Sequence, residues 1–108
     1  MKIIKKNRIF KVGINNITLN EVAKISLKSN EMLTFVNGKV EYDIVKKNWG
    51  FYATPSINNR LLKFSLKTCI IKNKVTNNSF VILVQKNKKK EFSKYLEDEK
   101  CKVVKWLS

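Results

Sequence analysis

The segment from Asn48 to Arg60 carries the side chains best suited to contact a ligand. It holds the only proline of the chain, one of its two tryptophans and one of its two arginines. On a regular strand, Trp49 and Phe51 share one face and can stack on an unpaired base or a sugar ring, whereas Tyr52 points to the opposite face. We therefore expect aromatic contacts from one side of this segment.

Polar side chains follow these rings around the proline. Their hydroxyl, amide and guanidinium groups can hydrogen-bond a phosphate, a carboxylate or a sugar. The candidate ligand-binding residues are Trp49, Phe51, Tyr52, Thr54, Ser56, Asn58, Asn59 and Arg60. The alternative interpretation is structural: the rings belong to the core of a sheet, and residues 55–59 form an ordinary turn.

A second candidate site is the start of a helix that the sequence predicts over residues 88–98. The candidate anion-binding residues are Lys88, Lys89 and Lys90. Acidic residues 97–99 stand at the other end, so the charge order opposes the helix macrodipole, and a bound anion at the first turn would remove that conflict. The alternative is a solvated lysine run, in which Lys94 pairs with Glu97 and Asp98 and salt screens the rest.

Catalytic and metal-binding signatures are absent from the sequence. It has no histidine and no P-loop or Rossmann spacing, so we predict no catalytic residue and lean against an enzyme. Glu31, Glu41 and Asp43 lack a fourth oxygen ligand and are expected to form a solvated strand face, so no metal or cofactor is predicted. Cys69 and Cys101 lack CxxC spacing and suit a reducing cytoplasm, although spacing alone leaves a bridge between them open.

The charge of the chain is the strongest pointer to a partner. Lys and Arg number 23 against 8 Asp and Glu, for a net charge of +15 and a pI near 10.0. Between Ile44 and Lys90 there are eleven basic residues and no acidic one. Such an imbalance attracts polyanions. A competing explanation is codon drift in a genome rich in A and T, because 21 of the cations are Lys and phosphate-binding sites more often use Arg.

Three functions follow from these features. The leading hypothesis is a small, non-catalytic basic module that contacts RNA or single-stranded DNA through lysines, with stacking on aromatic rings. The second is a subunit that docks on an acidic protein partner or completes an oligomer of unspecified size. The third is a binding domain or enzyme for a phosphorylated or carboxylated small molecule at residues 49–60.

Localisation is predicted from what the sequence lacks. The N-terminal stretch Met1–Gly13 has no apolar region of a secretory signal, and the longest apolar run, Phe80–Val84, is far shorter than a membrane span. We therefore expect a soluble, cytoplasmic protein with no transmembrane segment.

Short alternating runs predict the strands that position these candidates. Residues 8–12 and 22–27 are expected to be strands, the second pairing with residues 32–36 after a loop at 28–31. Asn37-Gly38 predicts a two-residue hairpin turn. That register sets Phe35 opposite Val40 and Leu33 opposite Tyr42 on an apolar face, with Thr34, Glu41, Met32 and Asp43 on a wetter one.

The second half of the chain is expected to hold another hairpin and the helix. Residues 66–85 turn at Asn77-Asn78, and 80–84 are predicted to be a central strand because they are apolar on both faces. Ser56 is expected to cap a short helical turn near 57–64 and Asn87 to cap the helix 88–98, with a strand at 101–107. Together these elements predict an α+β fold: a single domain over 1–108, with one curved, mostly antiparallel sheet of about six to eight short strands and the C-terminal helix packed on it.

Overall fold

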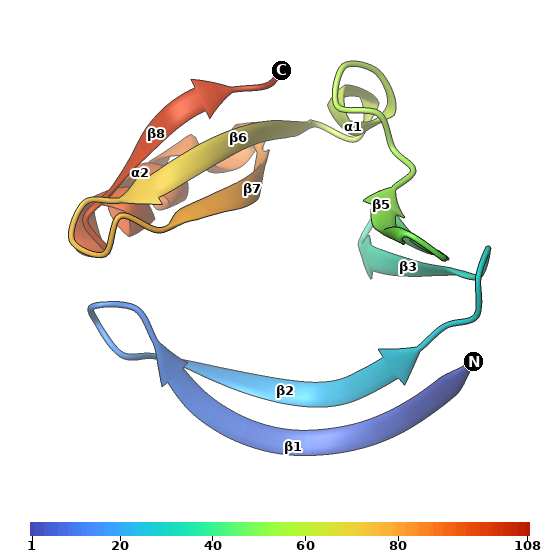
Figure 1. Cartoon of the computed structure of the whole chain (residues 1–108). Coiled ribbons are helices and arrows are strands. Elements are labelled where there is room, and N and C mark those ends of the chain that lie inside the picture. Colours follow the sequence, from blue (N-terminus) through green and yellow to red (C-terminus); the bar gives the residue numbers. More distant parts are fainter. The chain divides into compact units, whose positions relative to one another are not determined.

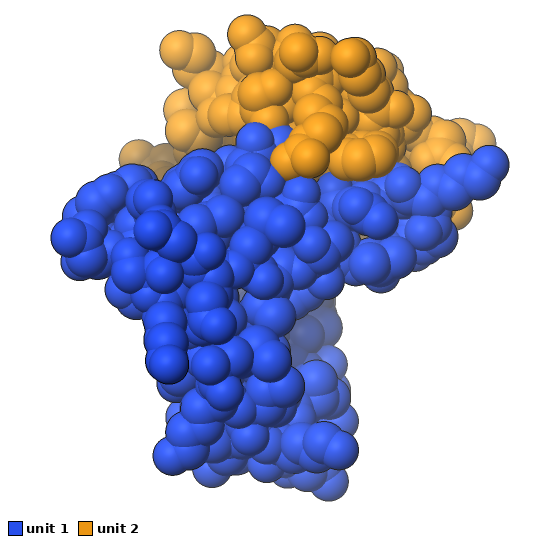
Figure 2. All heavy atoms as spheres, turned by 90° about the vertical axis from the view of Figure 1, so that its right-hand side faces the viewer, with its two compact units in different colours: residues 1–55 blue, residues 56–108 orange.

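A computed structural model describes residues 1–108. The chain divides into two compact units, Met1–Pro55 and Ser56–Ser108, coloured blue and orange in Figure 2. Each unit has its own sheets and is treated by itself below. The expectation of one domain over the whole chain stays a prediction.

The first unit consists of antiparallel strands only. Its strands are β1 Lys2–Val12, β2 Ile17–Ser26, β3 Met32–Asn37, β4 Val40–Lys47 and β5 Gly50–Ala53. Strands β1 and β2 form a two-stranded ribbon (Figure 1), and β3, β4 and β5 form a second sheet in that order. Most side chains of the ribbon are exposed on both faces.

The second unit packs a helix on a three-stranded sheet. Its elements are α1 Arg60–Lys63, β6 Leu66–Asn73, β7 Ser79–Gln85, the 3₁₀ turn η1 Lys86–Lys88, α2 Lys89–Asp98 and β8 Cys101–Trp106. The sheet is antiparallel with the order β7-β6-β8. Buried Cys69, Ile71, Val84 and Cys101 form its core, against which α2 packs Phe92 and Leu96, side chains that recur at helical spacing.

The predicted class is confirmed: the fold is α+β, with eight antiparallel strands, a short helix after Pro55 and a C-terminal helix. The strands form three sheets, however, where the sequence predicts one. Strand β2 pairs with β1 and not with residues 32–36, so the expected neighbour was wrong. The reason is that residues 2–12 form a continuous eleven-residue strand, which offers β2 a long partner close in sequence.

The first hairpin forms where it was predicted but in another register. Asn37 pairs with Val40 and Phe35 with Tyr42, so the two-residue loop is Gly38-Lys39 and not Asn37-Gly38. Gly38 has a φ of +62°, which a two-residue turn with glycine in its first position requires. The shift of two residues keeps every side chain on its predicted face.

The burial of those two faces follows the expectation at most positions: Leu33, Val40 and Tyr42 are half-buried, whereas Met32, Thr34 and Glu41 are exposed. It departs from the expectation at a few. Phe35, on the face predicted to be the core, is exposed, whereas Asp43 and Val45 on the wetter face are buried. The hydroxyls of two threonines satisfy the Asp43 carboxylate, as detailed below, and a buried carboxylate needs such partners.

Two further expectations for the second unit were wrong. Residues 80–84 lie in the edge strand β7, and β6 is the central strand because β8 pairs along its other side. Asn87 lies in η1 and does not cap α2, which begins at Lys89 with Lys88 in the cap position and no side-chain cap. The hairpin between β6 and β7 and the final strand are confirmed.

The two cysteines are free thiols buried in one core. Cys101 pairs with Asn73, four residues along β6 from Cys69. That offset separates the two Cα atoms by about 13 Å at the rise of a strand, well beyond the span of a disulfide. Burial also raises the pKa of the Cys69 thiol, which disfavours the reactive thiolate.

No helix of this structure has the length and apolar character needed to cross a membrane.

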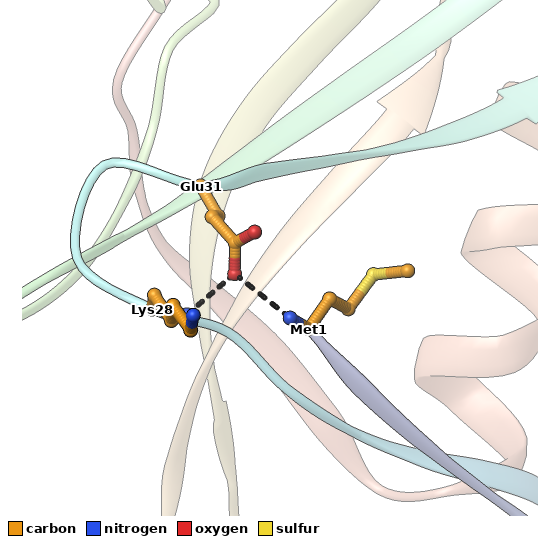
Figure 3. A network of polar contacts seen from close by, with 3 residues as sticks. All are labelled: Met1, Lys28 and Glu31. Carbon is orange, nitrogen blue, oxygen red and sulfur yellow. Dashed lines mark hydrogen bonds and ion pairs between the residues drawn. The ribbon is translucent and has the colours of Figure 1, made fainter.

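Within the first unit, Glu31 ties the loop before β3 to the chain terminus (Figure 3). Its Oε1 atom accepts a hydrogen bond from the Lys28 backbone N–H at 2.6 Å and lies 3.5 Å from the Met1 ammonium group. The hydrogen bond from Lys28 is the main reason that the pKa of this carboxyl lies below its ordinary value of 4.5. The charged form of Glu31 therefore stabilises the fold.

The substitution Glu31→Gln tests this contribution, because it removes the charge and keeps an oxygen for the Lys28 N–H. A group whose pKa is lowered by folding stabilises the native state above its unfolded pKa and loses that effect as pH falls through the folded pKa. We expect a lower melting temperature than wild type at pH 7, with the gap closing as pH drops below 4.5. Glu41→Gln, at an exposed position of the same sheet, should show no such gap. A gap that does not narrow as pH falls below 4.5 would contradict the account.

Candidate nucleic-acid interface

The segment 49–60 contributes to both units, because their boundary lies between Pro55 and Ser56. Trp49, Phe51, Tyr52 and Thr54 belong to the first unit, whereas Ser56, Asn58, Asn59 and Arg60 belong to the second. The predicted ligand-binding residues therefore divide into two sets, one in each unit, and each set is described separately.

Trp49 lies in the tight turn between β4 and β5, outside the strands. Its ring stacks on Tyr52, with 6.1 Å between the ring centroids and an angle of 22° between the planes. The expectation that Trp49 pairs with Phe51 was therefore wrong. The reason is that β5 begins only at Gly50, where a φ of +146° turns the chain, so strand alternation does not extend to Trp49.

Phe51 lies on the other face of the sheet, next to a lysine. It pairs with Lys46 across β4 and β5, and the Lys46 Nζ atom lies 6.0 Å from the centroid of its ring. All three rings are open to solvent: 68% of Trp49, 66% of Phe51 and 43% of Tyr52 are exposed. The structural alternative, in which these aromatics fill the core, does not hold.

Thr54 holds the end of β5 in place. Its hydroxyl donates to Asp43 Oδ2 at 3.2 Å, its backbone N–H donates to the Asp43 carbonyl at 3.0 Å, and Thr34 donates to Asp43 Oδ1 at 2.6 Å. Asp43 itself is only 4% exposed. This buried carboxylate therefore links β3 and the end of β5 to β4, at the end of the β4–β5 hairpin opposite the Trp49 turn.

In the second unit, Asn59 and not Ser56 takes the cap position of α1, so that expectation was wrong, although Ser56 contacts the first turn. Its Oγ atom accepts a hydrogen bond from the Arg60 backbone N–H at 3.2 Å, and its carbonyl accepts one from Leu61. Asn59 stands at the cap position without a side-chain cap bond. Asn58, Asn59 and Arg60 are exposed.

The lysine run stands at the start of α2, as expected. Lys88 occupies the cap position, Lys89 and Lys90 begin the first turn, and all three are exposed. Lys94 pairs with Asp98 one turn later, at 3.1 Å. The solvated alternative predicted this ion pair. The three lysines lie at the first turn of α2, where backbone N–H groups have no partner within the helix.

A groove in the second unit joins Lys89, one of the predicted anion-binding residues, to residues that the sequence analysis did not propose as a site. It lies between α2 and the sheet and is lined by Lys67, Lys89, Phe92, Ser93, Leu96, Val103 and Trp106. Lys67 Nζ lies 4.7 Å from the Trp106 ring centroid, and Phe92 meets that ring edge-on at 6.2 Å. Lys67 could have pointed to this groove from the sequence, because it is a charged residue on the same face of the strand as the apolar residues Cys69 and Ile71.

Comparison with known proteins yields no relative: no protein-family model, no characterised protein and no solved structure matches this chain. The function must therefore be argued from its own residues.

The role of Asp43 can be measured by its removal. Asp43→Ala leaves the Thr34 and Thr54 hydroxyls without their acceptor, which should cost about 1–3 kcal/mol of unfolding free energy. Glu41→Ala is the matched control, because Glu41 lies on the same face of β4 and is exposed. Denaturant unfolding followed by tryptophan fluorescence gives both values. Equal stability of the two variants would show that Asp43 does not hold the sheet together.

Proposed function

We propose that this protein is a small, non-catalytic basic module that binds RNA or single-stranded DNA in the cytoplasm. Lysines supply most of the affinity, and exposed rings add stacking on unpaired bases. The observation that carries the proposal is the exposure of Trp49, Tyr52 and Phe51 on a sheet whose neighbouring positions are Lys46 and Lys47.

Charge supports a polyanionic ligand in each unit. The first unit has ten Lys and Arg against four Asp and Glu, and the second has thirteen against four. Several carboxylates are already engaged: Glu21 lies 3.0 Å from Arg8 Nε, and Asp98 pairs with Lys94. Lysines without a carboxylate partner gain from phosphate neighbours, chiefly by releasing counterions from the nucleic acid.

The exposed rings favour a single strand over a duplex. A flat aromatic side chain can stack on a base only when the base is unpaired, and one such contact is worth about 1–3 kcal/mol with little dependence on sequence. Trp49 at the tip of a turn offers such a ring. The lysine run 88–90 adds candidate phosphate contacts in the second unit.

Docking on an acidic protein is the second candidate, because exposed Trp and Tyr also anchor protein interfaces. Nuclease treatment separates the two: a complex that survives it is held by protein contacts, whereas a nucleic-acid complex is lost.

Fluorescence anisotropy of a labelled 20-nucleotide single strand tests the proposal at low salt. Trp49→Ala should weaken binding at least about fivefold, the lower end of the range for one stacked base. Phe35→Ala is the matched control, since Phe35 is an exposed ring of the same sheet that pairs with Tyr42 and not with a lysine. Absence of binding by the wild type, or equal losses in the two variants, would refute it.

A further inference from the structure

The groove of the second unit is built from three elements. Lys89, Phe92, Ser93 and Leu96 recur at the spacing of one helix face, so they line it along α2, while Lys67 comes from β6 and Val103 with Trp106 from β8. Its volume is about 290 Å³, close to the lower limit of small-molecule sites. All of these residues lie within Ser56–Ser108.

A β-bulge brings Trp106 into this groove. Val103 pairs with Ile71 and Lys105 with the preceding residue of β6, so Val104 has no partner across the ladder. In a regular strand, residues 103 and 106 would point to opposite faces. The extra residue reverses the alternation, and Trp106 joins Val103 on the side of α2. The ring nevertheless stays 42% exposed, so it remains accessible.

Lys67 is an unusual residue for its position. It shares the helix-covered face of β6 with Cys69 and Ile71, the most deeply buried core residues. A lysine on a strand face that is otherwise buried keeps its charge only by extending its ammonium group toward water. Here that group extends over the Trp106 ring, and Lys89 supplies a second ammonium group from the first turn of α2.

We propose that this groove binds one nucleotide, with the base against Trp106 and the phosphate between Lys67 and Lys89. The lining contains two cations and no carboxylate, so it favours an anion and repels a cation. A bare phosphate would leave Trp106 and Phe92 unused, and an uncharged apolar ligand would leave both lysines unused. A planar base that carries a phosphate uses both parts.

The lysine can accommodate the ligand without a change of fold. Lys67 now covers the indole face on which a base would stack, but its four-carbon side chain is flexible and its ammonium group is a mobile point charge. An arriving phosphate attracts that group away from the ring, which frees the indole face for the base. The inference rests on the proposed function only where the nucleotide is part of a strand.

The test uses the full chain with Trp49→Phe, which leaves Trp106 as the single tryptophan. Titration with adenosine monophosphate should quench Trp106 fluorescence in a saturable way. Adenosine without phosphate and inorganic phosphate without a base should each bind more weakly. Absence of saturable quenching by the monophosphate and by a strand alike overturns the inference.

Lysine variants in the same background locate the phosphate. Lys67→Gln and Lys89→Gln should each reduce affinity by up to about fivefold, the upper end of the range for solvent-exposed charge pairs. Lys102→Gln is the matched control, because Lys102 pairs with Lys72 on the opposite face of the same sheet. Equal losses in all three variants would show that only general charge matters and would overturn the site. Circular dichroism verifies that each variant is folded.

An oligoadenylate of twelve nucleotides distinguishes the two sources of the nucleotide. Quenching of Trp106 by the strand, reduced by Lys67→Gln, assigns the groove to one unit of a bound strand. Quenching by the monophosphate alone assigns it to a free nucleotide, even if strand binding elsewhere on the protein proves absent. Strand binding in the anisotropy assay without any change at Trp106 leaves the proposed function intact and refutes the groove.

Discussion

The positive charge of this protein cannot be neutralised from within, and the rest of the account depends on that constraint. Each unit has four carboxylates against ten or more cations. Part of this small supply is engaged in the fold itself: Asp43 is buried under two threonine hydroxyls, and Glu31 joins Met1 and Lys28. The remaining lysines repel one another, which is the physical basis for proposing an anionic partner.

Each unit places a lysine beside an exposed aromatic ring, but the two units do so with different secondary structure. In the first, a short β5 and a tight turn leave Trp49 and Phe51 at the surface, where Lys46 lies against one ring. In the second, a β-bulge turns Trp106 toward α2, where Lys67 lies over its ring. Lysine beside an exposed ring is the combination from which proteins build sites for unpaired nucleotides, because phosphate and base are then contacted together.

Sequence patterns predicted the structural features that are set by residues close together in the chain. Alternation and turn residues gave the antiparallel strands, the α+β class, the final helix and the faces of the hairpin around Gly38. They could not give pairing between distant strands, so β8 beside β6 was missed. Trp106 was missed for a related reason: one unpaired residue, Val104, reverses the strand alternation on which sequence analysis depends. The rings of 49–52 are exposed, as contact with a ligand requires, but the stacking of Trp49 on Tyr52 follows from a turn whose extent the sequence does not reveal.

The dependence of single-strand affinity on salt concentration tests the central claim most directly. If unpaired lysines hold the strand, the logarithm of the binding constant for a 20-nucleotide RNA should fall linearly with the logarithm of salt concentration, with a slope of about −3 or steeper for four or more phosphate contacts. A slope near zero, or no binding at the lowest salt, would contradict the account and leave the lysine excess without a role in binding.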